Sequence, residues 1–204
     1  MQAFQLGNIV AGLGISGQST WANRPGAAAL NGRLWLMTDV GPGTVFRSNG
    51  TYWKPCGGVA VIGGSNTAAS ITGTTSKTAL GTLAVPAGLA NVPGACFLGE
   101  TLWSVTNNVN SKGIKIELGT TVFYSITGAS VSSDANYTMI RVRSQNSQVG
   151  MAIASAAGVG TSSAAVVTGT ENMSAALNIV ISSQLSNSAD TATLEGWTVR
   201  LLIP

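Results

Sequence analysis

The sequence predicts an all-β protein with an N-terminal arm and a small β-meander, followed by a C-terminal, jelly-roll-like β-sandwich. In one run Ile114, Ile116 and Leu118 alternate with Lys115 and Glu117, the pattern of a strand with one apolar and one solvated face. About eight such runs follow one another in the C-terminal part, separated by Asn, Ser, Gly and Pro turn signals, a spacing typical of a sandwich. Two strands cannot bury an apolar face alone, so these runs are expected to pair into sheets.

Composition favours a protein that buries its surface against other subunits. The 204 residues are 45% hydrophobic but only 8% charged, against about 25% in a typical soluble domain. Surfaces with few charges lose little solvation energy when they pair. The net charge of +3 is spread thinly, without the Lys/Arg cluster that nucleic acid requires. Arg141 and Arg143 flank Val142, and we predict that they lie on the solvated face of one strand.

The first segment, residues 1–20, is an uncharged apolar arm. Its glycines disfavour a helix, since each costs about 1 kcal/mol relative to Ala. Phe4, Leu6 and Ile9 would be exposed if the segment stayed free, so we expect them to dock on a partner chain. The alternative is a disordered tail.

Residues 21–58 are expected to form a small anchoring module with the arm. A short helix is predicted over 21–32, and a three-stranded meander over 33–55. The hairpin signal Asn49-Gly50 predicts a type I′ turn between the second and third strands. A sheet this small cannot supply its own core, so we expect other subunits to cover it. Its predicted partner contacts are Trp21, Trp35 and Trp53.

Residues 59–78 are rich in Gly, Ser, Thr and Ala and are predicted to be a linker, and residues 79–204 to be the sandwich. The stretch 96–126 organises the sandwich, because it reads as a strand, the polar turn TNNVNSKG and a second strand. The predicted strands are 80–85, 96–105, 114–118, 122–126, 137–143, 149–154, 177–185 and 194–203.

The residues that carry enzyme chemistry are scarce. Histidine is absent, which removes the commonest general base and metal ligand. Glu100 and Glu117 could face each other across the organising stretch, but each also fits the polar side of a strand. Asp39, Asp134 and Asp190 could contribute to a cation site, although Asx turns are the simpler role. We therefore assign no catalytic, cofactor-binding or metal-ligating residue.

Two further features concern the cell compartment. Cys56 and Cys96 are expected to be free thiols, because no secretory signal precedes them. No run reaches about 18 consecutive apolar residues, so no membrane insertion is expected.

The segment 21–58, WANRPGAAALNGRLWLMTDVGPGTVFRSNGTYWKPCGG, resembles a short module of structural proteins in tailed bacteriophages. Residues 22–25, 32–35, 39 and 50–55 match its pattern. The segment 98–123 and the ending 193–204 are similar to C-terminal domains of phage fibre and head-decoration proteins. This resemblance implies a β-rich homotrimeric appendage in the virion, assembled in the host cytoplasm and attached to capsid or tail proteins. It leaves head or tail location open.

Two functions follow as expectations. The first is a non-enzymatic virion protein, a head fibre or decoration protein anchored by its N-terminus. The alternative is a tail fibre or receptor-binding protein that recognises host surface glycan by stacking Trp103, Tyr124 or Tyr137 on sugars. Against that alternative, these aromatic residues would equally fit a core or a trimer interface. The scarcity of carboxylates disfavours a depolymerase.

Overall fold

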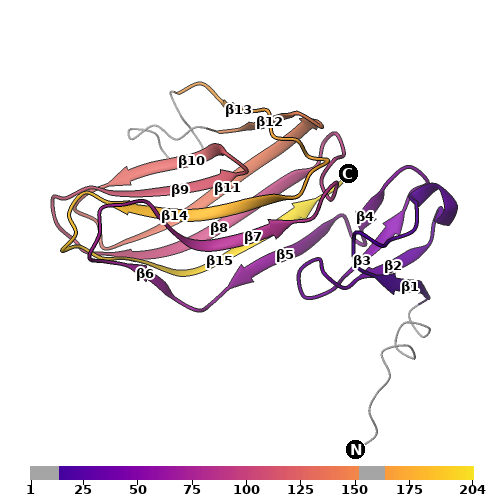
Figure 1. The fold of residues 1–204 in the computed structure, drawn as a ribbon, viewed down its shortest axis with the longest axis horizontal. Coiled ribbons are helices and arrows are strands. Elements are labelled where there is room, and N and C mark those ends of the chain that lie inside the picture. Colours follow the sequence, from indigo (N-terminus) through magenta and orange to yellow (C-terminus); the bar gives the residue numbers. More distant parts are fainter. Residues whose placement is uncertain (1–13, 152–163) are drawn as a thin grey trace, which may run out of the picture.

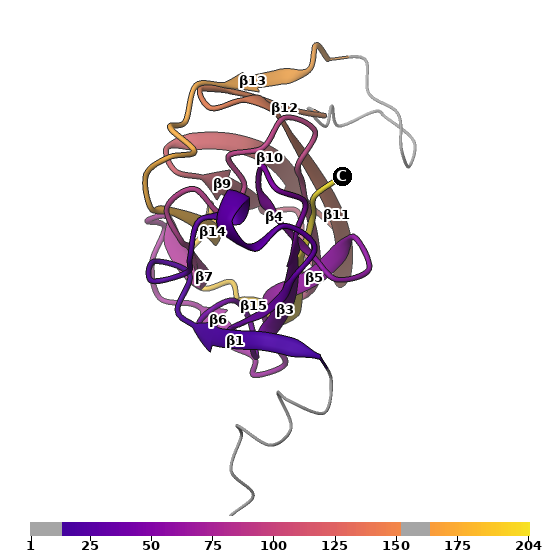
Figure 2. The ribbon, with the colours of Figure 1, turned by 90° about the vertical axis from the view of Figure 1, so that its right-hand side faces the viewer.

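The computed structural model describes residues 14–151 and 164–204, and it confirms an all-β sandwich (Figure 1). These residues form fifteen strands and one short 3-10 turn, Ala27–Leu30. Two sheets face each other and a third, smaller sheet lies at one end of them (Figures 1 and 2). Within the same residues, no helix has the length and apolarity needed to cross a bilayer.

The small sheet has the strand order β1-β2-β3-β4. The meander predicted over 33–55 is present, with β2, β3 and β4 antiparallel to one another. The sequence analysis missed β1, which pairs with β2 in parallel. The helix predicted over 21–32 is limited to the single 3-10 turn. The strand bounds are Ile15–Ser19 for β1, Leu34–Met37 for β2, Thr44–Ser48 for β3 and Trp53–Pro55 for β4.

The Asn49-Gly50 signal marks a hairpin, but not the two-residue type I′ turn we predicted. β3 ends at Ser48 and β4 begins at Trp53, so the loop has four residues. Gly50 has a φ of 88°, whereas Asn49 does not adopt a positive φ. Instead, the Asn49 side-chain oxygen accepts hydrogen bonds from the backbone N–H groups of Thr51 and Tyr52 at 3.0 and 2.9 Å. The side chain caps the loop in place of a tight backbone turn.

The sandwich consists of a four-stranded and a seven-stranded sheet. The smaller has the order β10-β9-β14-β7 and the larger the order β13-β12-β11-β8-β15-β5, with β6 also paired to β15. The bounds in the smaller sheet are Thr78–Val85 for β7, Lys112–Leu118 for β9, Thr121–Gly128 for β10 and Leu177–Leu185 for β14. The bounds in the larger sheet are Val59–Ser65 for β5, Ala69–Ile71 for β6, Cys96–Val105 for β8, Ser133–Ser144 for β11, Ser147–Gly150 for β12, Val167–Gly169 for β13 and Ala192–Leu202 for β15.

Much of the segment 59–78, predicted to be a linker, lies in the large sheet. β5 and β6 both pair antiparallel with β15. Gly63 and Gly64 lie within β5 and permit a close approach between strands. A Cβ built on Gly64 would lie 2.8 Å from the backbone oxygen of Trp197. The ladder shifts register beside it, between the pairs Val199–Gly63 and Arg200–Val61, which marks a β-bulge.

The polar run TNNVNSKG is a crossover between sheets and not a hairpin turn. β8 belongs to the seven-stranded sheet and β9 to the four-stranded one, so the chain changes sheet over residues 106–111. β9 forms its hairpin with β10 instead, around Gly119 at a φ of 60°. Alternation identified Ile114, Ile116 and Leu118 correctly as buried, although Glu117, predicted to be solvated, is buried too. Alternation carries no information on which sheet a strand joins.

A contiguous core joins the two parts of the chain. It includes Trp21 and Phe46 of the N-terminal part together with Leu89 and Phe97 of the sandwich. The Trp21 indole N–H also donates a 2.9 Å hydrogen bond to the backbone oxygen of Ala87. The sandwich of the same chain therefore covers the small sheet, where we had expected other subunits to cover it.

Candidate functional site

The predicted partner contacts divide into three groups. Phe4, Leu6 and Ile9 lie outside the described residues. Trp21 and Trp53 are buried within the chain, and Trp35 is half-buried. Burial removes Trp21 and Trp53 from the surface that a partner could touch.

Arg24 and Asp39, which match the pattern found in the sequence, both contact Trp21. The Arg24 guanidinium stacks over the Trp21 ring at 3.7 Å from its centroid. Burial lowers the pKa of Arg24, and the charge of Asp39 opposes that shift. The Asp39 side chain accepts a 2.6 Å hydrogen bond from the Trp21 backbone N–H. Residues of the phage-like pattern thus hold the junction between the small sheet and the sandwich.

Two of the three aromatic residues considered for sugar stacking are inaccessible. Trp103 has no exposed surface, and its indole N–H donates to the Thr101 hydroxyl at 3.0 Å. Tyr124 is buried with its hydroxyl bonded to Asn136, and burial together with the charge of Asp134 raises the pKa of Tyr124. Tyr137 alone is open to a ligand, with 47% of its surface exposed.

The two carboxylates considered as a pair lie in different sheets. Glu100 on β8 forms an ion pair with Arg200, and Glu117 on β9 forms one with Lys77 at 2.9 Å. In the described part of the chain, no group of three metal-ligating side chains comes together. Glu100 and Glu117 therefore do not form the carboxylate pair that glycoside hydrolysis needs.

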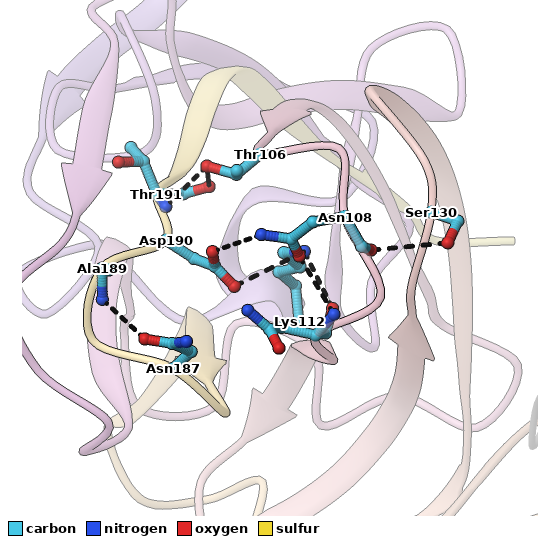
Figure 3. Close-up of polar contacts among 9 residues, drawn as sticks. Thr106, Asn108, Lys112, Ser130, Asn187, Ala189, Asp190 and Thr191 are labelled. Carbon is cyan, nitrogen blue, oxygen red and sulfur yellow. Dashed lines mark hydrogen bonds and ion pairs between the residues drawn. The ribbon is translucent and has the colours of Figure 1, made fainter.

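A buried polar network closes one end of the sandwich (Figure 3). Lys112 and Asp190, whose side chains are 2% and 4% exposed, form an ion pair at 3.6 Å. The Lys112 ammonium donates to the side-chain oxygen of Asn108 at 2.5 Å and to the backbone oxygen of Asn110 at 2.8 Å. The Asn108 amide donates to Asp190 at 2.6 Å. The crossover after β8 is thereby tied to the loop between β14 and β15.

This network stabilises loops and does not present a reactive group. The hydrogen bond from Asn108 is the main cause that lowers the pKa of Asp190; desolvation opposes it, and bonds from Asn110 and Lys112 reinforce it. Thr106 adds a second link, because its hydroxyl accepts a 2.9 Å hydrogen bond from the Thr191 backbone N–H. Asp190 Oδ2 is buried without a hydrogen bond and faces only the Lys112 ammonium at 3.6 Å, so its charge depends on that ion pair.

The strongest candidate for an interaction site is the outer face of the seven-stranded sheet. We call outer face the set of outward side chains on β5, β8, β11 and β15, namely Val59, Val61, Leu98, Glu100, Leu102, Tyr137, Met139, Thr198, Arg200 and Leu202. One row across it places Met139 opposite Leu98, Leu98 opposite Arg200 and Arg200 opposite Val61. Leu102 is 52% exposed and Val61 46%. Large apolar side chains that share one sheet face are typical of a protein interface.

The prediction that Arg141 lies on a solvated strand face is confirmed, because its side chain is exposed. Val59 and Val61 of the outer face were not predicted, because their segment was interpreted as a linker. Their alternation with the buried residues Ala60 and Ile62 was the signal available in the sequence.

The comparisons with known proteins add no family. No protein-family model and no curated protein matches this chain.

Proposed function

We propose that this chain is a non-enzymatic structural subunit of a tailed-phage virion, a head fibre or decoration protein that assembles as a homotrimer. Its N-terminal arm and small sheet attach to the particle, and its sandwich projects from it. The fold class fits this role but is shared by many proteins, so the proposal depends on the surface and on the resemblance of residues 21–58.

The observation that carries the proposal is the apolar outer face. Its exposed Leu, Val and Tyr side chains lie on neighbouring strands of one rigid sheet, and its opposite charges Glu100 and Arg200 already neutralise each other. A second copy that covers this face would bury apolar area without leaving either charge unpaired. The low content of charged residues agrees with such an assembly.

A second candidate is a tail fibre that binds host glycan, and one observation supports it. Tyr137 is an exposed aromatic ring on the outer face, next to the Glu100–Arg200 pair across β8. Aromatic rings with polar neighbours can bind sugars, although the same residue suits a subunit interface.

The experiment that tests the first candidate is to label the protein on intact phage particles and image them. We expect the label on the head. Label on the tail tip, together with loss of cell adsorption in a Tyr137→Ala phage, would favour the glycan-binding candidate. Absence of label from purified particles would reject both.

A further inference from the structure

A groove lies where the small sheet meets the end of the sandwich, and the C-terminal residue Pro204 is part of its lining. We call it the junction groove. It is open to solvent and has a volume of about 560 Å³. It is lined by Arg47, Lys54, Pro55, Cys56, Gly57, Gly58, Gly94, Cys96, Arg141, Leu202, Ile203 and Pro204.

Three cationic side chains converge on this groove from two sheets. Arg47 on β3 lies directly opposite Lys54 on β4, and Arg141 comes from β11 of the sandwich. Like charges directly opposite each other destabilise a sheet. None of the three takes part in the ion pairs of the described residues, which involve Lys77, Lys112 and Arg200. The fold thus keeps an unfavourable charge arrangement at the junction groove.

The chain has no side-chain carboxylate to neutralise the groove. All seven Asp and Glu residues lie in the described ranges, and none lines it. Each is engaged elsewhere: Asp39 with Trp21, Glu100 with Arg200, Glu117 with Lys77, Asp134 with Asn136, Glu171 with Thr120, Asp190 with Lys112 and Glu195 with Ser104. The Pro204 oxygen accepts a 3.0 Å hydrogen bond from the Tyr52 hydroxyl.

The lining also indicates what kind of anion would fit. Leu202, which is half-buried, and the exposed Pro204 give the groove an apolar part. None of the lining residues is aromatic, so the groove lacks the stacking surface that sugars and bases use. An acidic peptide satisfies both features, since its carboxylates pair with Arg and Lys while its aliphatic side chains contact the apolar part.

We propose that the junction groove binds an acidic, aliphatic peptide segment of another virion protein and so forms part of the attachment surface. This rests on the proposed structural role in the particle. The chemistry itself is independent of the particle, because the purified chain should bind such a peptide alone.

The test uses fluorescence anisotropy with labelled peptides of alternating Glu and Leu, alternating Lys and Leu, and a sulfated heparin oligosaccharide. At low salt we expect only the Glu-Leu peptide to bind tightly, with weaker binding at high salt. Arg47→Glu should weaken binding at least tenfold while the urea midpoint stays equal or rises, because the like-charged pair becomes an opposite-charged one. A merely structural role for Arg47 would not separate binding from stability in this way.

Arg141→Glu should weaken binding of the Glu-Leu peptide by a similar factor to Arg47→Glu. The matched control is Arg143→Glu, on the same strand two residues away, exposed and outside the groove lining. Equal losses in the Arg141 and Arg143 variants would mean general attraction and would overturn the proposal. Tighter binding of the oligosaccharide than of the Glu-Leu peptide, or no peptide binding, would also overturn it. None of these results would affect the imaging test of the proposed function.

Discussion

At the scale of single residues, Trp21 was predicted to be an anchor, which is correct, but its predicted role as a partner contact is wrong. Its apolar bulk and its place in the phage-like pattern predicted a contact with a partner. Three groups of its own chain bind it instead: the Arg24 guanidinium, the Asp39 carboxylate and the Ala87 carbonyl. A sequence pattern identifies an anchor but not the surface it anchors to.

We therefore predict that Trp21→Ala lowers the free energy of unfolding by about 3–5 kcal/mol, the usual cost of truncating a buried Trp. Urea unfolding measures it. Trp35→Ala is the comparison, and we expect a smaller loss because that ring is only half-buried. A Trp21 variant of unchanged stability that no longer joined particles would restore the partner-contact interpretation.

The Lys112–Asp190 pair leads to a prediction on pH. The pKa of Asp190 in the folded chain lies below its ordinary value of 3.8, so the unfolded chain binds protons first as the pH falls. The stabilisation from this carboxylate is complete above the unfolded pKa and is lost as the pH falls towards the folded one, from about pH 5 downwards. Hydrogen bonds from Thr121 and Thr120 also lower the pKa of Glu171, against desolvation, so it contributes in the same direction.

Asp190→Asn should be less stable than the unmodified chain at pH 7, and the difference should shrink at pH 3. Urea midpoints at both pH values measure this. The control is Asn187→Ala in the same loop. This change removes the side-chain oxygen that accepts a hydrogen bond from the Ala189 N–H, and an amide does not titrate, so its effect on stability should not depend on pH. A deficit in Asp190→Asn that is equal at both pH values would contradict the assigned role of the charge.

At the scale of elements, the strands of the C-terminal part were predictable and their assembly was not. The predicted strands 96–105 and 177–185 coincide with β8 and β14, because apolar alternation between strong turn signals marks a half-buried strand. The partners of a strand depend on contacts distant in the sequence. Hence the crossover after β8, the pairing of β5 with β15 and the parallel strand β1 went unpredicted.

The pairing of β1 depends on a glycine that the sequence analysis counted only as a helix breaker. A Cβ at Gly17 would lie less than 3.0 Å from the Trp35 ring, so the ring would have to shift, and its indole N–H is bonded to the Ser19 hydroxyl at 3.0 Å. We predict that Gly17→Ala destabilises the chain by about 1–3 kcal/mol, the cost of overpacking. Gly26→Ala is the control, because a Cβ added there would meet nothing within 4 Å and the φ of Gly26 is −58°.

Thermal unfolding of both glycine variants measures this prediction. Gly26→Ala should stay within about 0.5 kcal/mol of the unmodified chain, as surface substitutions usually do. Equal stability of the two variants would mean that β1 can separate from β2 at little cost, and that the packing of Trp35 on Gly17 is unimportant.

At the scale of the whole molecule, the distribution of charge separates two kinds of surface. The three described ion pairs neutralise cations of the sandwich, whereas Arg47, Lys54 and Arg141 remain together at the junction groove. The outer face is instead mainly apolar. Attraction between charges acts at a distance, whereas apolar contact acts only at close range. This difference is consistent with the two partners that we propose, an acidic segment at the groove and another copy of the chain on the outer face.

The last prediction concerns the outer face. Leu102→Asp should raise the dissociation constant of the proposed homotrimer at least tenfold, because assembly would then bury an unpaired carboxylate. A tenfold change corresponds to only about 1.4 kcal/mol. Since Leu102 is already 52% exposed in the single chain, its folding should be unaffected. Val109→Asp is the matched control, as Val109 is 84% exposed on the crossover loop and away from the outer face. Sedimentation at micromolar concentration distinguishes the outcomes: an unmodified chain that sediments as a monomer, or equal dissociation of both variants, would show that the outer face does not join copies of the chain.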